Sequence, residues 1–364
     1  MESVFSAFHE VTVDALTEVL EHAGTLPKGH VTAIETRPNA AFNSAIIHLD
    51  VTYSADAPAS APQALVLKLN AASHGQNEVS FYKLSQNAGL NPSVLVPCFS
   101  AAYEPETGNS HLLLLDVSAT HKAPVERGAL LSLDGVPDKA HRGGVVEVLA
   151  KFHATWWEHP RLGESGPTAV ADAYRDRAAF GEHWEKYREA FTAFSRHAGD
   201  SFPADVLARF SRVLDKHAKL WAYLEPRVTT LSGLTLAHND CYLTQFLCPQ
   251  AEQAQTYLVD FQDVCSDFAA RDLVYLLATF WTTEQRHLYE QDLLRVYYRT
   301  LVQCGVAGYS FDKLLQDYRL MLTYMMFQPV WDYSYGADAA YWKPKMQCLT
   351  SAYEDLNCTD LLGA

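Results

Sequence analysis

Several features that mark particular classes of protein are missing or scarce in this chain of 364 residues. Basic residues number 28 against 43 acidic ones, and the formal net charge is -15. This balance argues against a nucleic-acid partner, because neutralising phosphates needs clustered Lys and Arg. No run approaches the roughly eighteen apolar residues that a membrane-spanning helix needs. The first residues also lack a basic start followed by an apolar block, so we expect no signal peptide.

Two common chemical frameworks are absent as well. The seven cysteines are an odd number and form no Cys-x-x-Cys pair, so neither a zinc ribbon nor a disulfide framework is indicated. No Gly-x-x-x-x-Gly-Lys-Ser/Thr pattern occurs, which removes the commonest phosphate-binding loop. Because 48% of the residues are apolar, the chain can bury a full core. We therefore expect a folded cytoplasmic protein with no nucleic-acid or membrane partner, and the sequence is silent on its oligomeric state.

The length favours two domains, and the hydrophobic pattern changes between them. In the first part, some segments have apolar residues at helical spacing and others alternate apolar and polar residues as strands do. We expect helices at 13–22 and 76–89, and strands at 31–38, 45–54, 63–70, 97–105 and 110–118. The second part is mainly helical, with helices expected at 143–159, within 173–227, at 283–305 and at 310–329. The prediction is an α+β protein with an antiparallel sheet plus helix in residues 1–117 and a larger helical domain in 118–364.

Two aspartates end strand-like runs inside the helical part. Asp240 follows "LTLAHN" and Asp260 follows "TYLV", twenty residues later. Each alone is compatible with a surface turn, but a strand–loop–strand arrangement would bring both carboxylates to one edge of a hairpin. Phosphoryl transfer needs an acceptor carboxylate beside the reacting hydroxyl and hard oxygen ligands for magnesium. Asp240 and Asp260 can supply both, and Gln245 can add an amide oxygen.

A lysine lies in the middle of an apolar strand, in "ALVLKLN". An unpaired buried ammonium is costly, so Lys68 needs a carboxylate. Glu78 lies ten residues on, at the start of the expected helix. A lone strand lysine can also extend to water, but with Glu78 in place the pair matches the nucleotide clamp of kinases.

Taken together, these motifs resemble the aminoglycoside phosphotransferase and choline kinase superfamily, and within it the ecdysteroid kinase-like branch. "HNDCYLTQ", from His238 to Gln245, is similar to the family's catalytic loop, His-Gly-Asp followed after four residues by Asn. "LVDFQ" at Asp260, followed by "ARDLVYLL" at Asp272, resembles its metal-binding stretch, and "LAKFHATWW" resembles the helix before the catalytic loop. The resemblance spans about Val31 to Phe280.

The resemblance implies a two-lobed protein-kinase-like fold and transfer of the γ-phosphate of ATP, or of GTP, to a hydroxyl of a small molecule. Asp240 would be the catalytic base, and Mg²⁺ would be bound by Asp260 with Gln245. Asp272 would brace the catalytic loop. The remaining implied nucleotide contacts are Lys68, Glu78, Asn43, Ser44 and the backbone at Leu115 and Val117.

Three positions depart from the family pattern. Asn239 stands where the family has Gly, which costs little if the backbone there is not left-handed. Gln245 replaces Asn and is one methylene longer, so the loop would have to retreat for it to reach magnesium. The phosphate-covering loop, 38–45, contains no glycine. These departures keep a second hypothesis open, a pseudokinase-like protein that binds a nucleotide or metabolite with little turnover.

The acceptor site is expected in the helical part, where "FQPVWDYSYGADAAYW" gathers aromatic residues around carboxylates. Such a group can hold an amine by cation–π contact and charge, or it can be ordinary core. The candidates are Trp331, Asp332 and Tyr335, with Asp263 beside the metal motif. An aminoglycoside-like antibiotic and another hydroxylated metabolite both remain possible acceptors.

Overall fold

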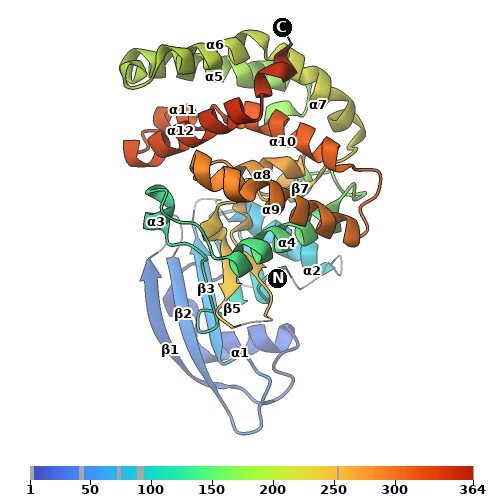
Figure 1. The fold of residues 1–364 in the computed structure, drawn as a ribbon. Coiled ribbons are helices and arrows are strands. Elements are labelled where there is room, and N and C mark those ends of the chain that lie inside the picture. The colour runs from blue at the N-terminus through green and yellow to red at the C-terminus, as the bar shows by residue number, and fades with distance from the viewer. Residues whose placement is uncertain (1–3, 41–44, 72–74, 88–93, 252–253, 364) are drawn as a thin grey trace. The chain divides into compact units, whose positions relative to one another are not determined.

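The computed structural model describes residues 4–40, 45–71, 75–87, 94–251 and 254–363 (Figure 1). The chain divides into two compact units. The first comprises Met1–Lys122 and Pro249–Val264, and the second comprises Ala123–Cys248 and Cys265–Ala364. This division differs from the boundary expected after residue 117, above all because Pro249–Val264 belongs with the first unit.

The first unit is built on an antiparallel sheet whose five strands run in the order β1-β2-β3-β5-β4. The strands are β1 (Val31–Ala40), β2 (Ala45–Tyr53), β3 (Ala64–Asn70), β4 (Cys98–Tyr103) and β5 (Ser110–Leu115). Helix α1 (Val13–His22) precedes the sheet and α2 (Gln76–Asn87) follows β3. The predicted antiparallel sheet with a helix inserted after its third strand is therefore confirmed.

The two faces of β3 serve different purposes. Leu65 and Leu67 are fully buried in an apolar core that also contains Leu16 and Leu20 of α1, which lies against the sheet (Figure 1). Successive side chains of a strand point to opposite faces, so Lys68 points away from this core. A lysine thus occupies the middle of a central strand without entering the core that α1 covers.

The second unit is mainly helical. Its helices are α3 (Arg127–Leu131), α4 (Lys139–Trp156), α5 (Arg177–His197), α6 (Ala204–Lys216), α7 (Ala218–Thr230), α8 (Ala269–Leu277), α9 (Thr283–Gln303), α10 (Phe311–Met325), α11 (Gln328–Ser334) and α12 (Ala339–Asp355). Within this unit they stack in layers, with α5 and α6 in one layer, α10 to α12 in the next, and α8 and α9 beyond (Figure 1). These helices confirm the helical character expected for the second part.

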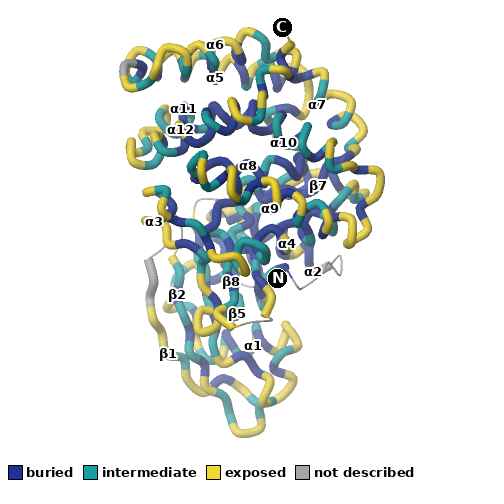
Figure 2. The backbone as a smooth tube through the Cα atoms, viewed as in Figure 1, coloured by how far each residue is buried: buried dark blue, intermediate teal, exposed yellow. Residues whose placement is uncertain are grey.

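Helix α8 is almost completely buried. All of its residues except Arg271 are buried. Figure 2 shows buried segments, in dark blue, running through the helices of the second unit. Its neighbour β10 (Cys265–Asp267) pairs antiparallel with β7 (Thr235–Ala237), the strand that leads to Asp240. The remaining short strands are β6 (His121–Lys122), β8 (Phe246–Pro249) and β9 (Tyr257–Leu258). The loop that carries Asp240 therefore starts from the most buried part of the second unit.

Candidate active site

In the first unit, one ammonium group is held by two carboxylates. Lys68 Nζ on β3 lies 2.8 Å from Glu78 Oε2 in the first turn of α2. The same nitrogen lies 2.6 Å from Asp260 Oδ1, just after β9. The side chains of Lys68, Glu78 and Asp260 are 11%, 2% and 28% exposed. The structure thus brings together three residues that are far apart in the sequence and that we predicted for one site.

The electrostatics of this group keep the lysine charged. Burial alone would lower the pKa of Lys68, but attraction to Glu78 and Asp260 raises it above its usual value. Burial raises the pKa of the Glu78 carboxyl. Two carboxyl groups thus face a single ammonium, an arrangement that suits the approach of a further cation.

The backbone at Asp260 has an unusual conformation that its neighbours maintain. Asp260 has φ 70°, in the left-handed region that Asp and Asn enter more readily than other residues with side chains. The Asn77 amide of α2 donates to the carbonyl oxygens of Gln262 (3.0 Å) and Val264 (2.8 Å). The ring of Phe261 stacks on Phe81 of α2, with centroids 4.2 Å apart. Helix α2 thus fixes the segment that presents Asp260, and no pattern in the sequence indicates that Asn77 takes part.

The other predicted nucleotide contacts are less informative. Asn43 and Ser44 lie outside the described residues. The Leu115 N–H donates to the carbonyl oxygen of Pro97 at 2.9 Å, and the carbonyl oxygen of Val117 accepts from the backbone of His121 at 2.8 Å. The segment after β5 is therefore a defined turn, and its contact with a purine stays a prediction.

In the second unit, the loop of Asp240 is fixed by a buried aspartate. Asp272, in the first turn of α8, accepts the backbone N–H of His238 at 2.6 Å and that of Asn239 at 2.8 Å. Its Oδ2 also lies 3.0 Å from His153 Nε2, and the side chains of Asp272 and His153 are fully buried. Burial alone would raise the pKa of Asp272, but hydrogen bonds and charge from His153 and His238 hold it below its usual value. The bracing role predicted for Asp272 is confirmed.

Asn239 adopts the conformation that we expected it to avoid. Its φ is 65°, so the backbone is left-handed at the position where the family pattern has glycine. We expected the replacement of Gly by Asn239 to cost little only if the backbone there is not left-handed, and that condition is not met. Asn is nevertheless one of the residues that tolerate this region, and its Nδ2 donates to the carbonyl oxygen of Ala237 at 3.2 Å. The loop keeps the glycine-like geometry with a different residue.

Asp240 itself is half-buried, three residues after β7. Gln245, at the end of a short 3-10 turn (Leu243–Gln245), donates from Nε2 to Asp240 Oδ2 at 2.9 Å. In this arrangement Gln245 orients the carboxylate that we predicted to be the base. Its role as a metal ligand stays a prediction.

The expected hairpin with both aspartates at one edge does not form. The strand before Asp240, β7, pairs with β10 in a two-stranded sheet, and the strand before Asp260, β9, is not part of that sheet. A three-residue strand such as β7 gives little local information about its partner, so spacing alone could not decide the pairing. Asp240 belongs to the second unit and Asp260 to the first.

The residues predicted to contact an acceptor have contrasting environments. Asp332 Oδ2 on α11 lies 2.7 Å from Nζ of the buried Lys345, so its charge is already matched inside the protein. Trp331 packs edge-on against Tyr187, whereas Tyr335 is 75% exposed. Asp263 is exposed and belongs to the first unit. Lys345 was not among the residues predicted from the sequence, where its only signal is a lysine within an aromatic segment.

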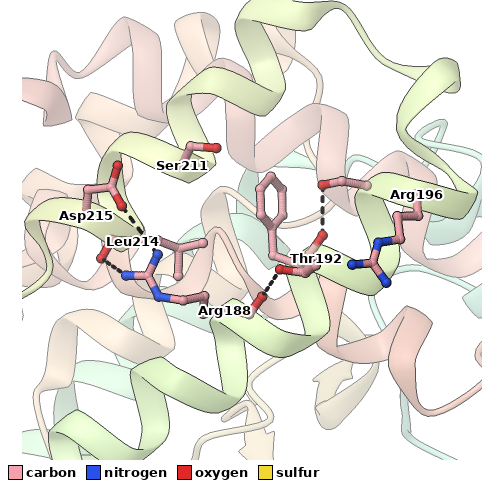
Figure 3. A pocket seen from close by; sticks show the side chains of 8 residues that line it. Arg188, Thr192, Arg196, Ser211, Leu214 and Asp215 are labelled. Carbon is pink, nitrogen blue, oxygen red and sulfur yellow. Dashed lines mark hydrogen bonds and ion pairs between the residues drawn. The ribbon is translucent and has the colours of Figure 1, made fainter.

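Other candidate sites are weaker. A groove of about 480 Å³ lies between α5 and α6, and none of the predicted site residues lines it (Figure 3). Its Arg188 is engaged by Asp215 at 3.3 Å and by the Leu214 carbonyl at 2.8 Å, so its charge already has a partner. In the described parts of the chain, no group of three or more His, Cys, Asp or Glu could hold a metal ion. No helix among the described residues is both long and apolar enough to cross a membrane.

Solved structures of small-molecule kinases share this fold. A choline/ethanolamine kinase family protein from Mesorhizobium loti is 12% identical, with 90% of this chain and 91% of that chain covered and a TM-score of 0.50. The Plasmodium vivax ethanolamine kinase is 10% identical, with 89% and 84% covered and a TM-score of 0.50. At such low identity the likeness shows the fold alone, and it confirms the predicted two-lobed, protein-kinase-like α+β class. No curated protein matches the chain.

The model of the ecdysteroid kinase-like family matches residues 79–306. Because this match covers more than half of the chain, the protein belongs to the ecdysteroid kinase-like family, and the predicted branch is confirmed. The matched range contains Asp240, Asp260 and Asp272 and begins one residue after Glu78. Family and fold together support a kinase-like phosphotransferase for small molecules.

Proposed function

We propose that this protein transfers the γ-phosphoryl group of ATP, or of GTP, to a hydroxyl group of a small molecule. The observation that carries the proposal is the ammonium of Lys68, with Glu78 at 2.8 Å and Asp260 at 2.6 Å. One carboxylate would suffice to neutralise a structural lysine. The second belongs to a partly exposed aspartate, as a site for a metal–nucleotide complex requires.

The nucleotide would be bound by the first unit. Lys68 would contact the α- and β-phosphates as a point charge, and Glu78 would hold it in place. The backbone at Leu115 and Val117 would meet the purine, and Asn43 and Ser44 would donate to the phosphates. Asp260 is the proposed main ligand of Mg²⁺ and Gln245 the second, since both offer the hard oxygen atoms that this ion prefers. When bound, magnesium neutralises charge on the nucleotide phosphates.

The fit of Asp260 to magnesium has support in its surroundings. Its side chain is 28% exposed, whereas that of Glu78 is 2% exposed, so Asp260 is the more accessible of the two carboxylates. Magnesium in such enzymes is bound by one or two carboxylates together with substrate phosphates. A dedicated cage of several acidic side chains is not required.

Asp240 is the proposed catalytic base. It would accept the proton of the acceptor hydroxyl as the oxygen attacks the γ-phosphorus and the bond from that phosphorus to the departing nucleoside diphosphate breaks. The hydrogen bond from Gln245 would keep the carboxylate oriented. Asp272 would act only through the backbone of the loop. The proposed acceptor is a hydroxylated small molecule, either an antibiotic of the aminoglycoside type or another metabolite, near Trp331, Asp332, Tyr335 and Asp263.

The experiment is a thermal-shift titration with ATP and MgCl₂, each alone and together, repeated with GTP. A ligand at a hundred times its dissociation constant stabilises a fold by about 2.7 kcal/mol. We expect a magnesium-dependent shift in the wild type that is lost in Asp260→Asn. Asn is the better replacement than Ala because it tolerates the left-handed backbone at position 260. Asp14→Asn, on the exposed side of α1, is the matched control and should retain the shift.

Turnover distinguishes an enzyme from a binding protein. Asp240→Asn should keep the nucleotide-dependent shift but lower ADP formation with hydroxylated acceptors about 10²–10⁴-fold. A magnesium-dependent shift without ADP formation in the wild type would fit a pseudokinase-like binding protein. No shift with either nucleotide would contradict the proposal.

A further inference from the structure

The second unit contains a buried ammonium surrounded by aromatic rings. The side chain of Lys345 on α12 has no exposed surface. Its Nζ lies 4.2 Å from the ring centroid of Tyr341, 5.3 Å from that of Tyr242 and 5.7 Å from that of Phe280. All three distances are within the range of cation–π attraction. We call Tyr242, Phe280, Tyr341 and Asp332 the ammonium box.

The box also supplies charge and a hydrogen bond. Lys345 Nζ lies 2.7 Å from Asp332 Oδ2 and donates to the Tyr242 hydroxyl at 2.9 Å. The rings contact one another, with centroids 5.6 Å apart for Tyr242 and Phe280 and 5.9 Å for Phe280 and Tyr341. Three π faces, one carboxylate and one hydroxyl around a single nitrogen are the groups that recognise a small organic ammonium ion.

The box adjoins the loop of the proposed base. Tyr242 follows Asp240 by two residues, and its N–H donates to the Asp240 carbonyl oxygen at 2.8 Å. Tyr242, one side of the box, therefore lies in the same tight turn as Asp240. The Asp332 side chain is 17% exposed and Tyr341 is partly exposed, so the box reaches the surface on the side of these two residues.

We propose that Lys345 is a specificity-determining residue: it acts as a tethered ammonium that fills this box and so excludes cationic acceptors from it. This inference rests on the proposed function, because it concerns the acceptor of that reaction. It predicts that the acceptor has a hydroxyl group but places no amine in the box. A free amine would have to displace a cation that is covalently attached and therefore present at high effective concentration. Asp332, predicted to hold an amine of the acceptor, instead holds Lys345.

The test removes the tether and supplies a free cation. Lys345→Ala lacks the propyl-ammonium end of the side chain, so we use n-propylammonium chloride as the probe, with 1-propanol as the neutral isostere and NaCl to match ionic strength. In Lys345→Ala we expect a saturable rise in Tm of about 2 °C or more with propylammonium and a smaller one with 1-propanol. The wild type and Lys343→Ala, which alters the exposed neighbouring lysine, should show no such rise.

Equal rescue by 1-propanol, or an equal shift in the wild type, would overturn the inference. A second pair of variants covers the case in which Lys345→Ala does not fold. Lys345→Met keeps the volume but leaves the Asp332 carboxylate unmatched, so Lys345→Met/Asp332→Asn should have the higher Tm of the two. If Lys345→Met is as stable as the wild type, the ammonium is not what the box recognises. None of these measurements uses a nucleotide or turnover, so their failure is distinguishable from failure of the proposed function.

Discussion

The carboxylate of Asp272 accepts the backbone N–H of His238 at 2.6 Å, across 34 residues of sequence. A second backbone N–H, from Asn239, reaches the other oxygen at 2.8 Å. Two fixed donors on one buried carboxylate leave the backbone before Asp240 little freedom. The position of the proposed base is thus determined by helix α8 and by the hydrogen bonds of Asp272, which contribute no chemistry of their own.

Removing the charge of Asp272 should therefore be costly. In Asp272→Asn an amide N–H₂ replaces one acceptor oxygen and faces a backbone donor, which leaves a buried donor without a partner. We expect the free energy of unfolding to fall by about 2–3 kcal/mol, measured by urea unfolding at pH 7. Asp292→Asn, on the exposed side of α9, is the matched control and should change little. Equal stability of the two variants would show that Asp272 does not hold the loop.

The contribution of Asp272 to stability should depend on pH. The folded protein holds the pKa of Asp272 below its usual value of 3.8, so the unfolded chain binds the proton more readily. The contribution of Asp272 to stability is therefore complete above about pH 5 and is lost as the pH falls through the lower, folded pKa. The difference in unfolding free energy between wild type and Asp272→Asn should be constant from pH 7 to 5 and shrink below pH 4. A difference that widens in acid would contradict this sign.

Asn239 offers a test of backbone strain. At φ 65° a side chain with a Cβ costs about 1–2 kcal/mol unless it is Asn or Asp. We expect Asn239→Gly to be more stable than Asn239→Ala by about 1 kcal/mol in urea unfolding. At the exposed helical position 186 on α5 the order should be reversed, with Lys186→Ala more stable than Lys186→Gly. The same order at both positions would mean that the loop relaxes out of the left-handed region.

The sequence was sufficient to predict the elements whose pattern is local. Helix α1 begins after Thr12, whose side chain accepts from the Ala15 N–H, and ends at His22, as the apolar spacing predicted. Lys68 was recognisable because an ammonium in an apolar strand requires a carboxylate. The fold class followed from such local signals and from the motifs around Asp240 and Asp260.

What could not be predicted depends on contacts between distant residues. Pro249–Val264 belongs to the first unit, where Asn77 binds Gln262 across 185 residues of sequence and Phe81 stacks on Phe261. Nothing in the amino-acid composition around Asn239 indicates that its backbone is left-handed. Lys345 resembles an exposed lysine in sequence, since its partners at positions 242, 280 and 332 come together only in the folded unit.

Variants of Lys68 and Glu78 should differ in stability in a definite order. Lys68→Met leaves Glu78 and Asp260 facing each other without a cation, so we expect a loss of about 3 kcal/mol. Glu78→Gln should cost less, because Lys68 keeps Asp260. The double variant Lys68→Met/Glu78→Gln should have a higher free energy of unfolding than Lys68→Met, and urea unfolding measures the difference. Arg37→Met, which breaks the exposed pair with Asp50, is the control and should have little effect. A double variant no better than Lys68→Met would argue that the carboxylates do not repel.

Asn77 should determine how firmly Asp260 is presented. Its side-chain amide donates to the carbonyl oxygens of Gln262 and Val264, and the Phe261 N–H donates to Glu78 Oε1 at 3.3 Å. Side chains of α2 therefore hold the backbone of the segment after Asp260. Asn77→Ala removes two of these bonds while leaving the charges of Lys68, Glu78 and Asp260 in place. We expect faster amide hydrogen exchange in peptides covering 257–264, because local opening governs exchange, and unchanged exchange in α1. Gln76→Ala, at the exposed neighbouring position, should leave both regions as in the wild type. Unchanged exchange at 257–264 in Asn77→Ala would mean that the stacking of Phe261 on Phe81 holds the segment without the amide.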